Sequence, residues 1–301
     1  MSRRNVPAND NISRNIEDKV PDHLQGNDKF VDIINWNIKF FSARNRPQAE
    51  IVKRIMQELN SDIFVLQEIE PGSLEPVAEF LNDIGAGAYK TAYGTTGGDQ
   101  LVAFLYDTEW VKAARNIEEL FAGKNLHASD GKEVFPRLPL HTIFSAKSSS
   151  QPLDFHLVGV HLKSKRGGGT PQREAAAKHL SQWFVESTTD EDVIILGDWN
   201  NTVEAADWKP FHELEKSGQA VFRELNVGKE ATHFSASGRS SRIDLVLMSP
   251  AMQKAMETER ATVIPWSDFS KNSAYLSEMI KTVSDHLPVL TRFYFTDEDG
   301  Q

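Results

Sequence analysis

The sequence predicts a layered fold of the α/β or α+β class, in which β-sheet packs against helices. About ten short apolar segments have the length and composition of strands, and three or four longer ones have the periodicity of amphipathic helices. Strands and helices are interspersed along the 301 residues, without an internal repeat. Several strands end abruptly in carboxylate, amide or imidazole side chains, and open layered folds place their chemistry at such strand ends.

In the first third of the chain, strands are expected at 30–36 and 63–66, on either side of an amphipathic helix. Pro47 suits the first turn of that helix. Its apolar face is formed by residues at helical spacing, namely Ile51, Val52, Ile55, Met56 and Leu59. A second, short helix is expected from Ser73, as its N-cap, to Leu81.

The middle of the chain is expected to contain more loop. The glycine-rich segment 85–98 is interpreted as a loop, and 116–134 as irregular. Consecutive strands are expected at 100–106 and 110–115, and a further strand ends near Ala146.

The remaining elements alternate between strands and helices. Thr170 and Pro171, as N-cap and first-turn proline, open a helix that continues to Phe184. A further helix is expected at 204–216. The remaining strands are expected at 155–161, 193–196, 242–248, 258–264 and 289–295.

One domain is expected, from residue 29 to residue 296. Residues 1–28 are polar and rich in asparagine, so we expect a disordered or loosely attached arm. Residues 297–301 are expected to form a tail. No segment approaches the length of a membrane span, and Met1 to Lys29 contain no apolar stretch of the signal-peptide type, so a cytoplasmic location is expected.

Composition excludes several classes of chemistry. The chain has no cysteine, which rules out disulfides, zinc–thiolate sites, iron–sulfur clusters and cysteine nucleophiles. Its net charge is −10, whereas proteins that bind nucleic acid by overall electrostatics are usually basic. A phosphate substrate would therefore have to be held locally, by a metal ion and a few basic side chains.

The polar strand ends supply the candidate metal ligands. Glu68, Asp198 and Asp285 come from separated strand ends, and Asn37 and Asn200 add amide oxygens. Such an all-oxygen set suits magnesium, manganese or calcium. Each residue taken alone has a simpler interpretation as a helix cap or an Asx turn.

A buried carboxylate and two histidines supply candidates for acid–base chemistry. Asp244 lies on an apolar face of its expected strand, where a carboxylate is costly unless it is paired. His161 follows one apolar strand and His286 precedes another. A carboxylate behind an imidazole fixes its tautomer and stabilises its charged form, as a general base or acid requires.

Six motifs at these strand ends occur in the order of a known family. They are Asn35-Trp36-Asn37, Leu66-Gln67-Glu68, His161-Leu162-Lys163, Gly197-Asp198-Trp199-Asn200, Arg242-Ile243-Asp244 and Ser284-Asp285-His286-Leu287-Pro288. Together they resemble the endonuclease/exonuclease/phosphatase superfamily, which includes deoxyribonuclease I, exonuclease III, neutral sphingomyelinases and inositol polyphosphate 5-phosphatases. The resemblance implies a four-layer α/β sandwich, with two packed mixed β-sheets flanked by helices and the site at one edge.

The resemblance also implies roles for individual residues. Glu68 resembles the principal metal ligand, supported by Asn37, and Asp285 would lie beside the metal or at a second metal position. The metal would be Mg²⁺ or Mn²⁺, with Ca²⁺ also open. Asp198 and Asn200 resemble the pair that orients the attacking water and the phosphate.

Two histidine–carboxylate pairs are implied in the same way. His286 resembles the family's paired histidine, with Asp244 behind it. His161 occupies the position of a second histidine found in the deoxyribonuclease I branch, and Asp99 resembles its acidic partner. The implied mechanism is in-line attack of water on a phosphoester, and the sequence does not assign which histidine is the base.

The substrate implied is nucleic acid, with DNA first and RNA open. Arg137 is similar to a phosphate-contacting arginine of deoxyribonuclease I. The loop after His161 resembles bacterial deoxyribonuclease I-like nucleases, and its basic residues would contact flanking phosphates: Lys163, Lys165, Arg166 and Arg173. Lys39 stands where some members carry a second acidic ligand, which favours the deoxyribonuclease-like arrangement.

We therefore expect a metal-dependent endonuclease that acts as a monomer without a membrane partner. The alternative is a phosphoesterase for a small molecule or a lipid head group, although the sequence lacks an exposed apolar hairpin for membrane docking. A binding protein without activity is disfavoured, because every motif residue is present.

Overall fold

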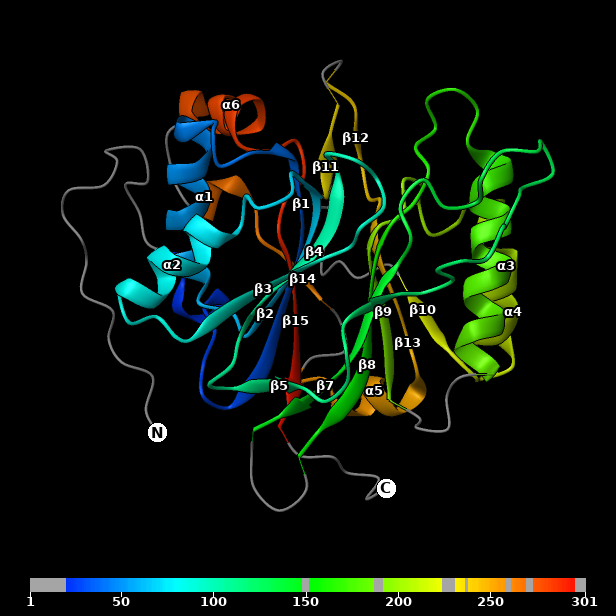
Figure 1. Cartoon of the computed structure of the whole chain (residues 1–301), viewed down its shortest axis with the longest axis horizontal. Helices are drawn as coiled ribbons and strands as arrows, with labels where there is room; N and C mark the ends of the chain where they lie inside the picture. Colours follow the sequence, from blue (N-terminus) through cyan, green and yellow to red (C-terminus); the bar gives the residue numbers. More distant parts are fainter. Residues whose placement is uncertain are drawn as a thin grey trace.

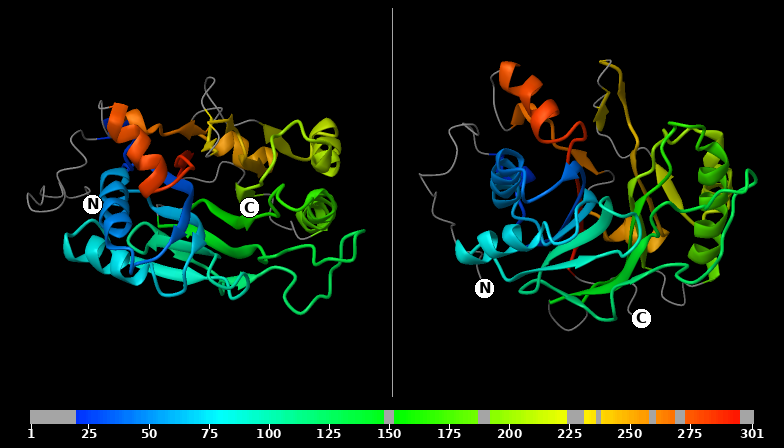
Figure 2. Two further views of the ribbon diagram at one scale, coloured as in Figure 1. Left: turned by 90° about the horizontal axis from the view of Figure 1, so that it is seen from above. Right: turned by 45° about the horizontal axis from the view of Figure 1, so that its top comes forward.

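Two mixed β-sheets pack face to face, and helices cover both outer faces (Figures 1 and 2). This computed structural model describes residues 20–147, 152–186, 192–223, 231–235, 238–257, 261–268 and 273–295. The predicted four-layer α/β sandwich is thereby confirmed. Within these ranges, no helix has the length and apolar character needed to cross a membrane.

The first sheet brings the ends of two parallel strands to one edge. In spatial order its strands are β14 (Thr262–Val263), β15 (Val289–Tyr294), β1 (Phe30–Phe41), β2 (Ile63–Ile69), β4 (Leu101–Asp107) and β3 (Tyr89–Tyr93). Strands β1 and β2 are parallel, with Asn37 opposite Gln67. The side chains that end these two strands are therefore neighbours.

The second sheet repeats this arrangement. In spatial order its strands are β10 (Val221–Arg223), β13 (Asp244–Met248), β9 (Val193–Asp198), β8 (Asp154–His161), β7 (Leu140–Ala146) and β5 (Val111–Ala113), with β6 (Glu118–Glu119) also paired to β7. Strands β8 and β9 are parallel, with His161 opposite Asp198, and antiparallel β13 places Asp244 opposite Asp198. A separate two-stranded hairpin consists of β11 (His233–Phe234) and β12 (Ser240–Ser241).

Helices form the outer layers. They are α1 (Arg46–Leu59), α2 (Glu75–Asp83), α3 (Thr170–Glu186), α4 (Lys209–Lys216), α5 (Pro250–Ala255) and α6 (Ser273–Thr282), with short 3-10 helices at Asp22–Leu24, Ala206–Trp208 and Trp266–Asp268. Helices α1 and α2 lie outside the first sheet, and α3 and α4 lie outside the second (Figure 1).

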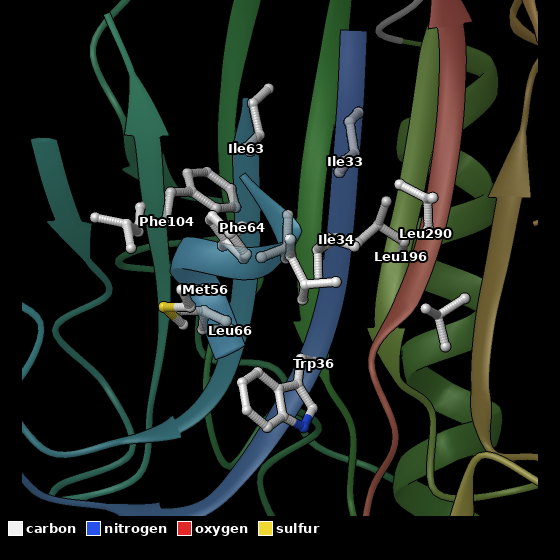
Figure 3. Packing of buried hydrophobic residues seen from close by; sticks show 14 of the residues in the cluster. Ile33, Ile34, Trp36, Met56, Ile63, Phe64, Leu66, Phe104, Leu196 and Leu290 are labelled. Carbon is white, nitrogen blue, oxygen red and sulfur yellow. The ribbon is translucent and has the colours of Figure 1, made fainter. Parts of the chain in front are cut away.

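The core between the sheets is close-packed. Ile34 and Leu66 of the first sheet pack in one cluster with Leu196 of the second (Figure 3). At Gly159 on β8, a Cβ atom would come within 2.9 Å of Val65 and 3.1 Å of Phe104, so only glycine allows the sheets to approach this closely. The relative position of the two sheets is thus fixed by packing.

Several expected elements differ from those observed. The segment expected to be a glycine-rich loop contains β3, and the irregular segment contains β6. Ser73 does not cap α2; its hydroxyl accepts a hydrogen bond from the backbone N–H of Ala43 instead. The expected helix 204–216 is a 3-10 turn followed by α4. Part of the expected strand 258–264 lies outside the described residues.

The last residues of the expected N-terminal arm, 20–28, belong to the domain. Residues 20–28 pack against the domain, with Val20 and Leu24 buried in the core. The guanidinium of Arg292 donates hydrogen bonds to the carbonyls of His23 and Gln25. So short a segment has no apolar periodicity by which it could be recognised from the sequence. Residues 1–19 of the expected arm and the expected tail, 297–301, lie outside the described residues.

Candidate active site

The candidate site lies where the two sheets meet, at the ends of their parallel strand pairs. Asn37 and Glu68 come from β1 and β2 of the first sheet, and His161 and Asp198 from β8 and β9 of the second. The structure therefore brings together four side chains that the sequence places far apart. Each of these strands is apolar before its polar end, and of the four polar side chains only Glu68 is partly exposed.

A direct contact across the sheets links these residues. The Asn37 amide donates to Glu68 Oε1 at 3.3 Å and to Asp198 Oδ2 at 3.1 Å. His161 Nε2 lies 3.5 Å from Asp198 Oδ2 and 3.9 Å from Glu68 Oε1. One amide and one imidazole thus lie between two carboxylates, with Asp198 buried and Glu68 partly open.

The turn after Asp198 fixes the orientation of its carboxylate. Asn200 has a left-handed backbone (φ 57°); its N–H donates to Asp198 Oδ1 at 2.8 Å and its side chain to the Leu162 carbonyl at 3.0 Å. A Cβ atom at Gly197 would lie 1.9 Å from the Val160 carbonyl oxygen. Glycine is therefore required immediately before the carboxylate.

His286 approaches the same carboxylate from the other side. Its Nδ1 donates to Asp244 Oδ2 at 2.9 Å, and its Nε2 lies 3.8 Å from Asp198 Oδ2. The His286 carbonyl accepts a hydrogen bond from the Trp36 indole at 3.1 Å. The pairing of His286 with Asp244, implied by the family resemblance, is present in the structure.

Burial and neighbouring charges shift the pKa values of these groups in different directions. Burial raises the pKa of Asp198 to about 7, with Asp244 adding to the rise and His286 opposing it. Burial also lowers the pKa of His286, but the carboxylates of Asp244, Asp198 and Asp285 outweigh it and raise the value to about 10. Burial, with Arg137 and His286 as neighbours, holds the pKa of His161 well below its usual value. At neutral pH His286 is therefore a cation and His161 is neutral.

The segment after Asn37 is strained and forms one rim of the site. Lys39 and Phe40 have positive φ angles of 20° and 50°, and Glu68 has one of 60°. The N–H of Phe40 donates to Glu68 Oε2 at 3.1 Å, and the ammonium of Lys39 lies 3.0 Å from Asp285 Oδ2. The backbone turn thus orients the glutamate and provides a cation for the aspartate.

Two buried side chains connect this rim to the loop that carries Asp285 and His286. The Gln48 amide donates to the carbonyls of Lys39, at 3.0 Å, and Val283, at 2.8 Å. The Ser284 hydroxyl donates to the Asn37 carbonyl at 2.6 Å and accepts from the N–H of His286. The sequence offered no signal for Gln48, because it lies on a helix that was recognised only by its apolar face.

The expected pairing of Asp99 with His161 is not present. Asp99 is exposed in a turn, and His161 Nδ1 is buried without a hydrogen-bond partner among the described residues. The positive φ angles of Gly97 and Gly98 turn the chain before Asp99. The other predicted residue of this region, Arg137, is partly buried and donates to Gln100 Oε1 at 2.6 Å and to the His161 carbonyl at 3.4 Å.

The basic loop is divided in its roles. Lys165 and Arg166 are exposed and Lys163 is partly exposed, as an interaction with flanking phosphates requires. Arg173 is 2% exposed and pairs with Asp207, so the expected contact with substrate is corrected to a structural role. Its position on α3, one turn after the loop, turns it inward.

The donor set on the Glu68 side fits a hard divalent cation. The Glu68 carboxylate is partly open and Asp198 is adjacent, so two carboxylates supply the oxygen ligands, and the Asn37 NH2 holds both of them by hydrogen bonds. Asp285, also expected to be near the metal, is instead paired with Lys39. Its position relative to a bound cation stays a prediction.

His233 is a site residue that no sequence motif singles out. Within the described part of the chain, His233, Asp285 and His286 form the one group of three ligand-type side chains whose donor atoms lie within 4.8 Å of one another. The Lys39 ammonium and the charged His286 make this group unfavourable for a further cation. Strand β11 carries His233 beside His286 through backbone pairing, which short-range sequence patterns do not encode.

Comparisons with known proteins agree with this geometry. Solved structures with the same fold include an endonuclease/exonuclease/phosphatase family protein from Bacteroides thetaiotaomicron (TM-score 0.64, 18% identity, covering 88% of this chain and 98% of that one). The human Nocturnin catalytic domain is similar too (TM-score 0.60, 19% identity, covering 89% of this chain and 95% of that one). So is truncated Caenorhabditis elegans TDP2 (TM-score 0.57, 17% identity, covering 91% of this chain and 100% of that one). A search of curated proteins found no match.

The family assignment comes from the sequence match itself. The sequence pattern described as "Endonuclease/Exonuclease/phosphatase family" matches residues 34–286, from the strand that carries Asn37 to His286 itself. The matched range includes the ends of both parallel strand pairs, together with His161 and His286. This chain therefore belongs to the endonuclease/exonuclease/phosphatase family.

Proposed function

We propose that this protein is a divalent-metal-dependent phosphodiesterase that hydrolyses DNA endonucleolytically, by in-line attack of an activated water. One observation carries the proposal: Asp198 lies between two buried histidines, of which His286 is charged and His161 neutral at neutral pH. A hydrolytic site for phosphoesters needs both a group that takes a proton and a cation that stabilises negative charge.

The residues of the chain divide these tasks. Asp198, with its raised pKa, accepts a hydrogen bond and then the proton from the attacking water, and neutral His161 beside it shares that task. The His286 imidazolium, held by Asp244, donates a hydrogen bond to a phosphoryl oxygen and the proton to the leaving oxygen. The Asn200 side chain is held within the same turn and orients the phosphate.

Glu68, supported by Asn37, would hold Mg²⁺ or Mn²⁺. When bound there, such an ion polarises phosphoryl oxygens and neutralises charge that develops in the transition state. Glu68 is prepared for that role because the N–H of Phe40 fixes one of its oxygens while the other faces the site.

DNA is supported as the substrate by the distribution of basic side chains. The net charge of the chain is −10, yet the loop that follows His161 exposes Lys165 and Arg166 and contains no acidic residue. Partly buried Arg137 lies near both this loop and the carboxylates; burial lowers its pKa, and the charges of Glu68 and Asp198 oppose that change. A line of cations beginning at the site fits a polyanion better than a single phosphate.

The deciding experiment is incubation of supercoiled plasmid with the protein in Mg²⁺, Mn²⁺ or EDTA. We expect nicked circles with either metal, none with EDTA, and none with Asp198→Ala. Asp83→Ala, on the exposed face of α2, is the matched control and should nick like the wild type.

The absence of nicking with every metal would contradict the endonuclease proposal. Linear single-stranded DNA, RNA and bis(p-nitrophenyl) phosphate would then be tested in turn. Hydrolysis of the small diester alone, abolished by Asp198→Ala, would establish instead a phosphoesterase for small molecules or head groups.

A further inference from the structure

Phe40 is an exposed aromatic residue at the rim of the site. Its side chain is 59% exposed, and the other large apolar side chains exposed in the described ranges are Val185 (45%) and Tyr294 (44%). The Tyr294 ring packs edge-on against Phe30, with centroids 5.3 Å apart. Phe40 has no comparable ring contact among the described residues. A single exposed ring is common on protein surfaces, so its meaning here depends on its place at the rim of the site and on its backbone.

The backbone at Phe40 is strained as well. Its φ of 50° lies in the left-handed region, which glycine or asparagine adopts far more easily than a bulky residue. The strain arises at a bulge in the pairing of β1 with β2. Asn37 pairs with Gln67 and Phe41 pairs with Ile69, so β1 advances by four residues where β2 advances by two. A position that combines strain with exposure, where glycine would fit, points to a function of the side chain.

Three hydrogen bonds hold this turn in place. The Asn37 side-chain oxygen accepts from the N–H of Lys39 at 3.0 Å, the Gln48 amide donates to the Lys39 carbonyl, and Glu68 Oε2 accepts from the N–H of Phe40. The turn is thus anchored directly to the carboxylate that would hold the metal. The Phe40 ring therefore extends from a backbone that is fixed by its hydrogen bond to Glu68.

The two rims of the site offer different chemistry. On the side of the first sheet, the rim offers the exposed ring of Phe40, and the Lys39 ammonium is neutralised by Asp285. On the side of the second sheet, the loop after β8 offers Lys165 and Arg166. A ligand lying across both rims would contact cations on one side and an apolar aromatic face on the other.

We propose that Phe40 stacks on an unpaired nucleobase next to the scissile phosphate, so that the enzyme prefers nucleic acid with accessible base faces. Within a duplex each base face is covered by its neighbours, whereas in a single strand, or at an end, a base can turn onto an aromatic ring. This inference rests on the proposed function and adds that single-stranded nucleic acid is preferred over duplex.

The test compares single and double strands of one sequence, using fluorescence anisotropy of labelled 12-mers bound to protein in the Asp198→Ala background. Phe40→Ala should weaken single-strand binding about 5- to 150-fold, the range for one base stacked on an aromatic ring, and change duplex binding less than about 2-fold. Phe40→Trp should bind at least as tightly as Phe40. Tyr294→Ala, an exposed aromatic on β15, is the control and should bind unchanged.

A modified strand identifies the stacking partner. Replacing the base beside the scissile phosphate by an abasic analogue should weaken binding of the Phe40 protein by the same factor and leave Phe40→Ala unaffected. Phe40→Gly should melt no lower than the wild type, because glycine relieves the strain, so a loss of binding in that variant is not a loss of fold.

The outcomes separate the two proposals. Equal losses for single strand and duplex, or no loss for either, would overturn stacking while hydrolysis of DNA by the wild type leaves the proposed function intact. A wild type that neither binds nor hydrolyses any nucleic acid overturns both.

Discussion

His161 and His286 lie on opposite sides of one carboxylate, are equally buried, and yet carry different charges. His286 has Asp244 at 2.9 Å behind it, whereas His161 Nδ1 has no hydrogen-bond partner among the described residues and Arg137 donates to the carbonyl of the same residue. One pKa rises to about 10 and the other falls well below 6.5. The group behind the ring, rather than burial, decides which histidine becomes a cation.

In the proposed mechanism this difference in charge gives the two histidines different roles, which their residue type alone does not. An imidazolium close to Asp198 can donate a proton or stabilise an oxyanion, and a neutral imidazole can accept a proton. Catalysis by one acid and one base therefore requires that the two environments stay unequal.

The largest effect is expected at the shared carboxylate. Asp198→Asn should reduce turnover by at least about 10³-fold, since the charged proton acceptor is lost. The same variant should unfold at higher temperature, because it removes a buried carboxylate whose pKa is raised from 3.8 to about 7.

The sign of the pH dependence follows from that raised pKa. Between pH 3.8 and about 7 the folded wild type holds a proton that the unfolded chain has released, so its stability falls as pH rises. The thermal advantage of Asp198→Asn should thus grow across this window, as measured by melting at several pH values. An advantage that shrinks with pH would contradict the assigned pKa shift.

Removing either histidine comes next. His286→Ala and His161→Ala should each lower turnover about 10²- to 10⁴-fold while circular dichroism stays unchanged. A double variant with full activity would remove both residues from the mechanism.

A smaller and more specific effect is expected at Asp244. Asp244→Asn keeps the hydrogen bond but removes the charge that raises the pKa of His286. The alkaline limb of the pH–rate profile should move to lower pH, and the profile of an Asp99→Asn variant should stay in place. An unshifted limb in Asp244→Asn would mean that another group controls it.

Gln48 tests positioning without touching the reacting groups. Gln48→Ala removes the amide that joins the Lys39 and Val283 carbonyls, so both loops can separate. We expect kcat to fall about 10-fold with KM nearly constant, and unfolding to cost about 2 kcal/mol less. Gln57→Ala, a glutamine on the same helix, serves as the control.

The smallest effect on activity is expected at a third buried histidine, His141, where substitution should change the stability of the fold instead. On the outer face of the second sheet, His141 Nε2 lies 2.9 Å from His156 Nδ1, and burial lowers the pKa of His141 to about 4. The unfolded chain therefore binds a proton below pH 6.5 that the folded chain resists, so stability falls as pH drops from 6.5 to 4. His141→Gln should flatten this acid limb in melting experiments, and exposed His127→Gln should leave it as it is.

The sequence predicted the strand ends of the site well but not the contacts between them. Asp198, Glu68 and Asn37 stand out because each ends an apolar run, and Asp244 because it interrupts an apolar face. Recognition of His233 requires knowing that β11 pairs beside His286, and the burial of Arg173 depends on Asp207, thirty-four residues later. These are long-range contacts, which local periodicity does not determine.

The same limit applied to the fold. The strong apolar run 193–196 predicts strand β9 correctly. Strand β3 lies in a glycine-rich segment that is typical of a loop, and α2 begins without the expected cap. Short edge strands take their conformation from the neighbour they pair with, so their own residues carry a weak signal.

The amide of Asn37 has a wider consequence, because it contacts a carboxylate of each sheet. Glu68 belongs to the first sheet and Asp198 to the second, and the sheets are kept in position by packing around Gly159. Sliding one sheet along the other by an ångström would break the pairing of these groups while leaving every strand and helix intact. Catalytic turnover should therefore depend on the alignment of the two sheets. Under mild denaturing conditions we expect activity to be lost before any secondary structure is lost.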